Sequence, residues 1–451
     1  MALENLLASH NPVYNPDDLK RYREDWSGIC GGLPTAVVRP SSIEEIATIA
    51  AACHRLGVRI TVQGGLTGLA GGAVPDDGDV VLSLERLNRI QEIDTLGGTV
   101  VAEAGVVLEK LCEAVEALDW YFPLDCGARG SCQIGGNVAT NAGGNRVLRY
   151  GTMRDLVLGL EVVLPDGTVL SMLNRVIKDN TGLDLKHLFI GSEGTLGIVS
   201  RVVLKLFPKP QRRHAALCAF DSFAQMTSLL KSARAALPTL SAFEVMWLDY
   251  LEAASRAVNR VLPFDGQHPL YALLEIESFE AEDDSPLESF LYRMLECGLT
   301  TDVILPQSEQ QAASLWQLRD AIGEILPRLH PFVAFDVGVP LSAMEAFVDE
   351  VATRLRNTYP DAEHLFFGHL GDGNLHLATG PYSDNDIEAV ETLVYSAVSA
   401  RGGSISAEHG IGRVKKPFLG YSRSDAQLAV MRTVKEAIDA KGVLNVGRIL
   451  D

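Results

Sequence analysis

The sequence predicts an α+β fold with two larger domains, and three observations carry that prediction. Strand-like runs alternate with amphipathic helices along 451 residues, a length that exceeds one ordinary core. Hairpin signals such as Asp166-Gly167 join neighbouring runs, which favours antiparallel pairing. No G-x-G-x-x-G or G-x-x-x-x-G-K-[ST] motif is present, so neither a Rossmann site nor a nucleotide P-loop is supported.

We expect residues 1–33 to form a helical lead-in and residues 34–211 to form the first domain. Thr35–Pro40 and Val58–Gln63 are typical of strands. Between them, Ser42 and Glu45 form a capping-box signal that opens a helix ending near His54. Further along, Leu158–Leu173 holds Asp166-Gly167 as the turn of a hairpin. Two prolines and the cationic "QRRH" mark the boundary near residue 211.

The second domain is expected over 212–425. Its strand-like segments alternate with long amphipathic helices near 341–357 and 385–401. This pattern predicts an antiparallel sheet with helices on one face. A last helix is expected from about Ser424 to Lys441. The last segment of the chain, 426–451, is assigned to this helix and the tail that follows it.

Composition narrows the class of protein. The chain has 47% hydrophobic and 22% charged residues, which is typical of a soluble folded protein. Its formal net charge of −19 repels phosphate backbones, so nucleic-acid binding is not expected. No apolar run has spanning length and the first residues lack a signal-peptide pattern, which predicts a cytoplasmic protein without transmembrane insertion. The seven cysteines include no C-x-x-C pair, so reduced thiols are expected.

Three segments crowd glycine with small polar residues: Gln63–Ala73, Gly130–Asn145 and Gly191–Val199. Glycine lets backbone N–H groups approach a ligand closely and form a nest for phosphate oxygens. Three such loops together predict a long, folded ligand that carries a diphosphate. The alternative is that these glycines serve only tight turns.

The stretch "GHLGDGNLH", Gly368–His376, surrounds an Asp-Gly pair with two histidines. A two-residue turn at Asp372-Gly373 would place His369 directly opposite His376, with Cβ atoms roughly 4.5–5.5 Å apart. Both rings could then reach one cation, and Glu408 beside His409 offers a third ligand. The alternative is a plain turn flanked by hydrogen-bonded histidines.

The segments "FPLDCGARGSCQIGGNVATNAGGN" and "KDNTGLDLKHLFIGSEGTLGIVS" resemble flavoproteins of the vanillyl-alcohol-oxidase type, in particular D-2-hydroxyglutarate and D-lactate dehydrogenases. This resemblance spans nearly the whole chain. It implies a two-subdomain FAD-binding domain, followed by an antiparallel sheet with helices and a C-terminal tail that returns to the FAD. Covalent members use a histidine in the first loop, where this chain has Leu66 and Thr67, so non-covalent FAD is implied. The cofactor-binding residues implied are Gln63, Gly64, Gly65, Leu66, Thr67, Gly68, Gly71, Pro123, Leu124, Asp125, Ser131, Gly135, Gly136, Thr140, Asn141, Gly144, Gly197, Ile198, Val199 and Asn445.

The same resemblance implies that His369, His376 and Glu408 bind a divalent metal, usually zinc. It makes His409 the catalytic base and Arg319 the residue that binds the substrate carboxylate. Three positions depart from the hydroxyglutarate pattern, which usually has threonine, lysine and asparagine where this chain has Gly323, Ala334 and Ala378. The sequence therefore predicts a pocket for a smaller, less charged or more apolar side chain than that of hydroxyglutarate.

The resulting hypothesis is oxidation of a D-2-hydroxy acid to the 2-oxo acid, with hydride transfer to flavin N5. Electrons would pass to an electron-transfer flavoprotein or a quinone, and a homodimer is implied by the resemblance. Three alternatives stay open at this stage: a D-2-hydroxyglutarate-specific dehydrogenase, a metal hydrolase that uses the His-His-Glu site, and a flavin subunit that only passes electrons.

Overall fold

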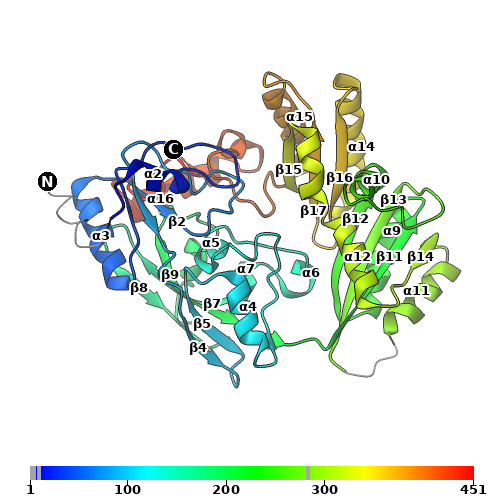
Figure 1. Ribbon diagram of the computed structural model, residues 1–451, viewed down its shortest axis with the longest axis horizontal. Coiled ribbons are helices and arrows are strands. Elements are labelled where there is room, and N and C mark those ends of the chain that lie inside the picture. The colour runs from blue at the N-terminus through cyan, green and yellow to red at the C-terminus, as the bar shows by residue number, and fades with distance from the viewer. Residues whose placement is uncertain (1–6, 8–11, 281–284, 451) are drawn as a thin grey trace. The chain divides into compact units, whose positions relative to one another are not determined.

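The chain folds into two compact units in the computed structural model, which describes residues 7, 12–280 and 285–450 (Figure 1). Unit 1 comprises 1–144, 151–209 and 408–451, and unit 2 comprises 145–150 and 210–407. The C-terminal segment thus returns to unit 1. Helices and antiparallel sheets occur in both units, which confirms the α+β prediction. The expected helical lead-in lies partly outside the described residues.

Unit 1 contains a small parallel sheet and a larger antiparallel sheet. The parallel sheet has the order β1-β3-β2, and the antiparallel sheet has the order β4-β5-β9-β7-β8. Val163 of β7 pairs with Val169 of β8 across the Asp166-Gly167 turn, which confirms the predicted hairpin. The strands are β1 (Ala36–Val38), β2 (Ile60–Gln63), β3 (Val80–Ser83), β4 (Ile90–Asp94), β5 (Thr99–Glu103), β7 (Val157–Val163), β8 (Val169–Met172) and β9 (Ile198–Lys205), with a separate pair β6 (Trp120–Tyr121) and β10 (Phe207–Pro208).

The predicted helix after β1 is α3, Ile43–Leu56. Ser42 caps it by accepting from the Glu45 amide at 3.3 Å, while the Glu45 carboxylate accepts from Ser41 rather than from Ser42. Gly57 ends the helix in the left-handed conformation, with φ 68°. The other helices of unit 1 are α2 (Pro16–Leu19), η1 (Lys20–Tyr22), α4 (Leu108–Glu116), α5 (Ile134–Ala139), α7 (Met153–Leu156), α8 (Lys186–Phe189), η3 (Lys416–Tyr421) and α16 (Asp425–Ile438).

Unit 2 is built on a seven-stranded antiparallel sheet with the order β14-β11-β13-β12-β16-β17-β15. The strands are β11 (Arg212–Phe220), β12 (Leu240–Trp247), β13 (Leu270–Ser278), β14 (Asp302–Ile304), β15 (Val333–Gly338), β16 (Glu363–His369) and β17 (Asn374–Gly380). The helices are α6 (Val147–Tyr150), α9 (Phe223–Ala236), α10 (Leu248–Ala257), α11 (Pro286–Glu296), α12 (Glu309–Arg319), α13 (Ile322–Ile325), η2 (Leu326–Leu329), α14 (Leu341–Thr358) and α15 (Ile387–Ser399).

Helices cover both faces of this sheet, so the prediction of helices on one face is wrong. On one face, Tyr250 of α10 stacks on Phe367 of β16, with ring centroids 4.2 Å apart. On the other face, Tyr395 of α15 packs against Phe335 of β15 at 5.3 Å. Central strands such as β16 are buried almost throughout and show no polar alternation that would reveal the second layer.

The short piece 145–150 joins unit 2 through buried ion pairs with β13. Arg146 donates through Nε to Glu275 at 2.9 Å, and Arg149 lies 3.1 Å from Glu277, which also accepts from Tyr150. Both glutamates are almost completely buried. Such charges are tolerated inside a protein only when they are paired, so each ion pair fixes this piece on the sheet.

Candidate active site

The histidine hairpin has a different register from the predicted one. β16 ends at His369 and β17 begins at Asn374, and these two residues pair with each other. His376 pairs instead with Phe367, so the prediction of directly opposed histidines at a two-residue turn is wrong. The turn is longer because the amides of Asp372 and Gly373 both donate to the His369 carbonyl.

Both imidazoles nevertheless lie on one face of the sheet. The register differs from the prediction by two residues, and side chains alternate with a period of two, so the face is preserved. The ring centroids of His369 and His376 are 5.3 Å apart with an edge-to-face angle of 77°. The two histidines therefore meet along a diagonal.

His369 belongs to a buried network with two charged residues that come from neighbouring elements. Glu244 of β12 accepts from His369 Nδ1 at 2.9 Å and from Arg319 Nε at 2.7 Å. Burial acts to raise the pKa of Glu244, but the neighbouring His369 and Arg319 outweigh it and hold that pKa below its usual value. Arg319 Nη2 also lies 3.1 Å from His369 Nε2. The structure thus brings Arg319 and His369 together, as part of one network.

His376 has its own carboxylate neighbour. Its Nδ1 lies 3.9 Å from Asp336, a completely buried residue that pairs with it on β15. A carboxylate beside Nδ1 favours the tautomer whose Nε2 lone pair is available to a metal. Each histidine of the hairpin therefore has a buried acid beside its Nδ1, at hydrogen-bond distance for His369 and at a longer 3.9 Å for His376.

The ligand atoms of His369, His376 and Glu408 all lie within 4.8 Å of one another. Glu408 directly follows Ala407, whose amide donates to the Asp336 carbonyl at 3.2 Å and so ties this part of the chain to β15. Two imidazoles and one carboxylate form a ligand set that suits zinc and similar divalent ions. These residues fit a divalent metal.

Asn374 supplies a further sign that a ligand belongs here. It shares the strand face with its partner His369, it is 5% exposed, and both polar atoms of its side-chain amide lack a hydrogen-bond partner within the described residues. A buried amide without partners costs stability unless a ligand or water satisfies it.

His409 is half-buried in a segment that is anchored at the residues after it. The amides of Ile411 and Gly412 donate to the Glu193 carboxylate, each at 2.7 Å. Burial raises the pKa of Glu193, although the two N–H donors act to lower it. Glu193 thereby holds the loop that carries His409.

The glycine loops of unit 1 pack backbone against backbone. A Cβ on Gly65 would lie 2.1 Å from the Ser131 carbonyl oxygen, and one on Gly144 would lie 1.9 Å from that of Asp125. A Cβ on Gly135 would meet the Ala104 side chain at 2.6 Å. Close packing therefore explains part of the glycine content, whereas Gly136 has open space around it.

Three buried amide oxygens beside these loops lack hydrogen-bond partners within the described residues: Gln63 Oε1, Gln133 Oε1 and Asn137 Oδ1. The orientation of Gln63 is fixed because its Nε2 donates to the carbonyls of Tyr22 and Ala73. Polar groups that are buried without a protein partner are usually satisfied by a ligand or by ordered water. Unpaired polar groups and open space beside Gly136 fit a large polar cofactor such as FAD.

Asn445 links the C-terminal tail to this region. Its Oδ1 accepts from the Val62 amide at 2.8 Å and its Nδ2 donates to the Glu193 carbonyl at 2.7 Å. Leu66 and Asn141 adopt positive φ, which is unusual for these residue types and marks tight loop geometry. The remaining cofactor positions lie in these same loops, in the segment before Cys126 and at the start of β9.

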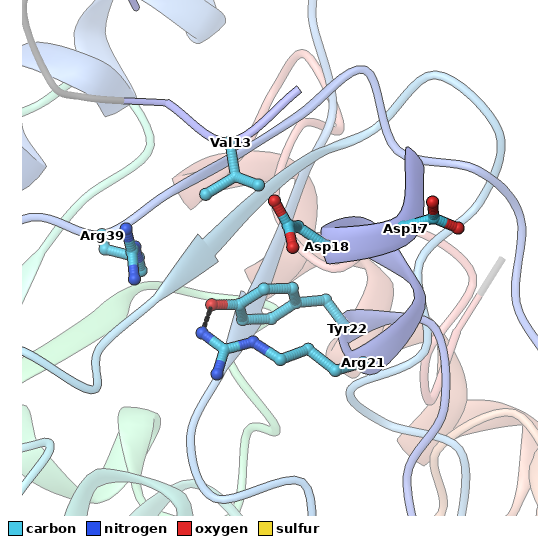
Figure 2. A pocket seen from close by; sticks show the side chains of 6 residues that line it. All are labelled: Val13, Asp17, Asp18, Arg21, Tyr22 and Arg39. Atoms are coloured by element: carbon cyan, nitrogen blue, oxygen red, sulfur yellow. Dashed lines mark hydrogen bonds between the residues drawn. The ribbon is translucent and has the colours of Figure 1, made fainter. Parts of the chain in front are cut away.

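A separate shallow cavity of about 330 Å³ lies on unit 1 and is lined by Val13, Asp17, Asp18, Arg21, Tyr22 and Arg39 (Figure 2). Arg21 donates to the Tyr22 hydroxyl, and both Arg21 and Arg39 lie within 3.4 Å of Glu85. Its cations are thus neutralised within the chain. None of the predicted site residues lines it.

Sequence reasoning missed Glu244, Asp336 and Glu193. The first two stand alone as acids in the apolar runs "LSAFEVMW" and "VAFDVG". A charged residue in a strand with no other charged residue is costly to bury without a partner, and this signal could have identified them. Glu193 lies in a glycine-rich loop, and an acidic residue in a loop is too common to indicate a buried role.

Two family models match the chain. Residues 34–173 match an FAD binding domain, and residues 209–449 match the C-terminal domain of FAD linked oxidases. Fold and site together define an FAD-dependent oxidoreductase. The chain belongs to the FAD-linked oxidases, which confirms the predicted family and its flavin cofactor.

Curated relatives place it beside the D-2-hydroxyglutarate dehydrogenases. The protein of that name from Bos taurus is 41% identical over 97% of this chain and 81% of its own length. The relative of that name from Xanthomonas citri pv. viticola is 39% identical over 97% of this chain and 93% of its own. The chain is accordingly an FAD-dependent enzyme of the kind that the sequence predicted.

Solved structures share the fold at lower identity. Alkyldihydroxyacetonephosphate synthase has a TM-score of 0.77 at 17% identity, covering 98% of this chain and 85% of its own. p-Cresol methylhydroxylase has a TM-score of 0.78 at 15% identity, covering 100% and 96%. These likenesses concern the fold alone.

The prediction of a cytoplasmic protein is wrong by this comparison. The relatives from Bos taurus, rice, rat and Arabidopsis thaliana are named as mitochondrial proteins. The prediction used the lack of a signal-peptide pattern and of an apolar run of spanning length, and neither observation separates the cytoplasm from the mitochondrion. Among the described residues, none of the helices combines the length and the apolar character needed to span a bilayer.

Proposed function

We propose that this protein oxidises a D-2-hydroxy acid to the corresponding 2-oxo acid, using non-covalent FAD and a divalent metal, zinc first among the candidates. The observation that carries the proposal is the cluster of His369, His376 and Glu408, in a chain that matches FAD-linked oxidase models over both halves. The relatives named D-2-hydroxyglutarate dehydrogenases support the substrate class.

A bound FAD would supply the acceptor for the hydride that leaves C2 of the substrate. The cradle proposed for it comprises Gln63–Gly68 and Gly71, Pro123–Asp125 with Ser131, the residues Gly135, Gly136, Thr140, Asn141 and Gly144, then Gly197–Val199 and Asn445. The protein's contribution there is to bind and orient the flavin through backbone N–H groups and through amides such as that of Gln63.

A metal at the histidine cluster would supply a Lewis acid that lowers the pKa of the substrate hydroxyl. His369, His376 and Glu408 would hold it. His409 is proposed to take the hydroxyl proton, because an imidazole with an ordinary pKa of about 6.5 is a suitable base near neutral pH. Arg319 is proposed to bind the substrate carboxylate through Nη1, whose partner Asp320, at 3.3 Å, is a half-exposed side chain that the substrate would displace.

The side-chain pocket is proposed to differ from that of a hydroxyglutarate enzyme. Ala334 and Ala378 pair with each other on the face that carries His376, and neither can donate to a distal carboxylate. A D-2-hydroxy acid with a small or apolar side chain is therefore the expected substrate, and hydroxyglutarate specificity is the alternative that the relatives favour.

The electron acceptor is proposed to be a separate electron-transfer flavoprotein or a quinone, and the assembly a homodimer. Both come from the resemblance to such dehydrogenases. Rates with each acceptor and the mass in solution would test them directly.

The decisive experiment is an anaerobic titration of the purified yellow protein with D-lactate, D-malate, D-2-hydroxyglutarate and longer D-2-hydroxy acids. We expect the flavin to bleach with a D-2-hydroxy acid and not with its L-enantiomer, and the rate to fall after chelation and return with zinc. A metal hydrolase would be colourless as purified. In a flavin subunit that only passes electrons, none of the D-2-hydroxy acids would bleach the flavin. Either result would refute the proposal.

A further inference from the structure

Two cysteines of unit 1 stand in direct contact. The sulfur atoms of Cys126 and Cys132 are 3.7 Å apart. Both are reduced thiols, Cys132 being buried and Cys126 half-buried. This contact is not required by the proposed oxidation of a hydroxy acid.

The chain between them is a compact reverse turn that directs the two sulfurs toward each other. The Arg129 amide donates to the Cys126 carbonyl at 3.0 Å, and the Cys132 amide donates to the Ala128 carbonyl at 2.8 Å. A disulfide needs a sulfur–sulfur distance of about 2.05 Å, so the sulfurs must approach by less than about 2 Å. Gly127 has no atoms around its Cβ position, which leaves room for that adjustment.

The surroundings of the two thiols shift their pKa values in opposite directions. The hydrogen bond from Cys126, assisted by Asn137 and the positive charge of Arg129, lowers the pKa of the Cys132 thiol. The same contact, together with burial, raises the pKa of the Cys126 thiol. A thiolate beside a protonated thiol is the arrangement of an attacking and a resolving cysteine.

We propose that Cys126 and Cys132 form a dithiol–disulfide site that hydroperoxides oxidise reversibly. One of the two sulfurs, as the thiolate, attacks a peroxide oxygen, the O–O bond breaks, and a sulfenic acid and one water (or alcohol) result. The other sulfur, 3.7 Å away, then attacks the sulfenic sulfur, the S–S bond forms, and a second water leaves. Two thiols lose two electrons and two protons in total, and one hydroperoxide is reduced.

The site is coupled to the glycine loops by backbone contact. Ser131, next to Cys132, touches Gly65, and Asp125, next to Cys126, touches Gly144, so closely that neither glycine could carry a Cβ. Any backbone shift that accompanies closure of the disulfide would therefore act on both loops. If these loops cradle FAD, as proposed above, oxidation changes how tightly the flavin is held.

Trypsin provides a direct test because it cuts after Arg129, between the two cysteines. The reduced holoprotein would be treated with hydrogen peroxide, alkylated and digested without reductant. We expect peptides 111–129 and 130–146 to appear joined, two hydrogens lighter than their sum, and to separate with dithiothreitol. Tandem mass spectrometry is needed because Cys112 lies in the same peptide as Cys126.

The matched variants are Cys126→Ser, which must abolish the link, and Cys30→Ser, which removes an exposed cysteine elsewhere and must leave it intact. The proposal is overturned if both cysteines of the folded wild-type protein can still be alkylated after peroxide treatment. It is also overturned if peroxide oxidises them to sulfinic acids and no disulfide forms between them. The coupling is tested by measuring how fast FAD dissociates from the oxidised and the reduced protein, followed by flavin fluorescence. Equal dissociation from the two forms would overturn the coupling. Failure of the proposed dehydrogenase activity would not affect the peptide result.

Discussion

The Glu244 carboxylate accepts a hydrogen bond from His369 Nδ1 at 2.9 Å while it also accepts from Arg319 at 2.7 Å. Glu244 is 1% exposed, so the interaction takes place away from water. A carboxylate in this position fixes the ring orientation and leaves Nε2, which Arg319 Nη2 approaches to 3.1 Å, as the atom that would bind the proposed metal. His369 would thus be oriented for coordination by the fold itself.

Glu244→Gln is expected to weaken zinc binding by roughly 10–100-fold, the usual effect of removing such a partner. The glutamine amide oxygen can still accept a hydrogen bond from Nδ1, but the negative charge that makes the imidazole a stronger ligand is lost. Competition with a chelator, followed by elemental analysis of the protein, measures the affinity. Glu309→Gln, an exposed position at the start of α12, is the control.

Loss of Glu244 also strands the buried charge of Arg319, which can cost about 3–5 kcal/mol. A double variant, Glu244→Gln with Arg319→Met, removes that charge, and its zinc affinity should remain low while its melting temperature recovers. Unchanged zinc affinity in both variants would contradict the orienting role.

Much of this architecture could be predicted from local sequence. Ser42 signalled the start of α3 and Asp166-Gly167 signalled the β7–β8 hairpin, because caps and tight turns depend on residues that are adjacent in the chain. The shared face of His369 and His376 was predicted although the register was wrong, since only the parity of the spacing determines the face.

Long-range relationships could not be predicted in the same way. Glu244 and His369 are joined only because β12 lies beside β16, and strand order leaves no local trace in the sequence. The pairing of 145–150 with β13 is equally non-local, since it depends on Arg146 and Glu275. The second helical layer was missed because strands buried on both faces, such as β16, show no polar–apolar alternation.

Ala334→Lys is expected to shift substrate preference toward D-2-hydroxyglutarate. Ala334 is exposed and lies on the strand face that carries His376, where an ammonium group could pair with a distal carboxylate. We expect the ratio of kcat/KM for hydroxyglutarate over D-lactate to rise roughly tenfold, the effect of one charge-assisted hydrogen bond. Ala334→Gln, which adds bulk without charge, is the control. If wild type already prefers hydroxyglutarate strongly, the pocket argument is wrong.

Asn374→Ala separates a role in ligand binding from a role in folding. The side-chain amide of Asn374 is buried and has no hydrogen-bond partner within the described residues, so its removal breaks no bond in the folded chain. The melting temperature should therefore stay the same or rise, because an unsatisfied polar group is costly. Substrate kcat/KM should fall by roughly tenfold if the amide contacts the substrate or a metal-bound group. A lower melting temperature with unchanged kinetics would assign Asn374 to the fold alone.

His364 should make the stability of unit 2 depend on pH. Burial, assisted by the charge of Arg356, lowers the pKa of this histidine to about 4, against an ordinary value of about 6.5. Its Nδ1 lies 2.6 Å from the Thr379 hydroxyl, while Nε2 is buried without a partner within the described residues. The folded state thus holds the neutral ring.

Because the folded pKa is the lower one, the unfolded chain binds the extra proton between about pH 6.5 and pH 4. The stabilisation is complete above the unfolded value and is lost as the pH falls toward about 4, by an amount on the order of 2–3 kcal/mol. His364→Gln removes this contribution, so the stability of the variant should fall less than that of wild type between pH 7 and pH 5. Urea midpoints for both proteins at these two pH values measure the difference, in which the other titrating groups cancel. Equal losses in the two proteins would mean that His364 is not the group responsible.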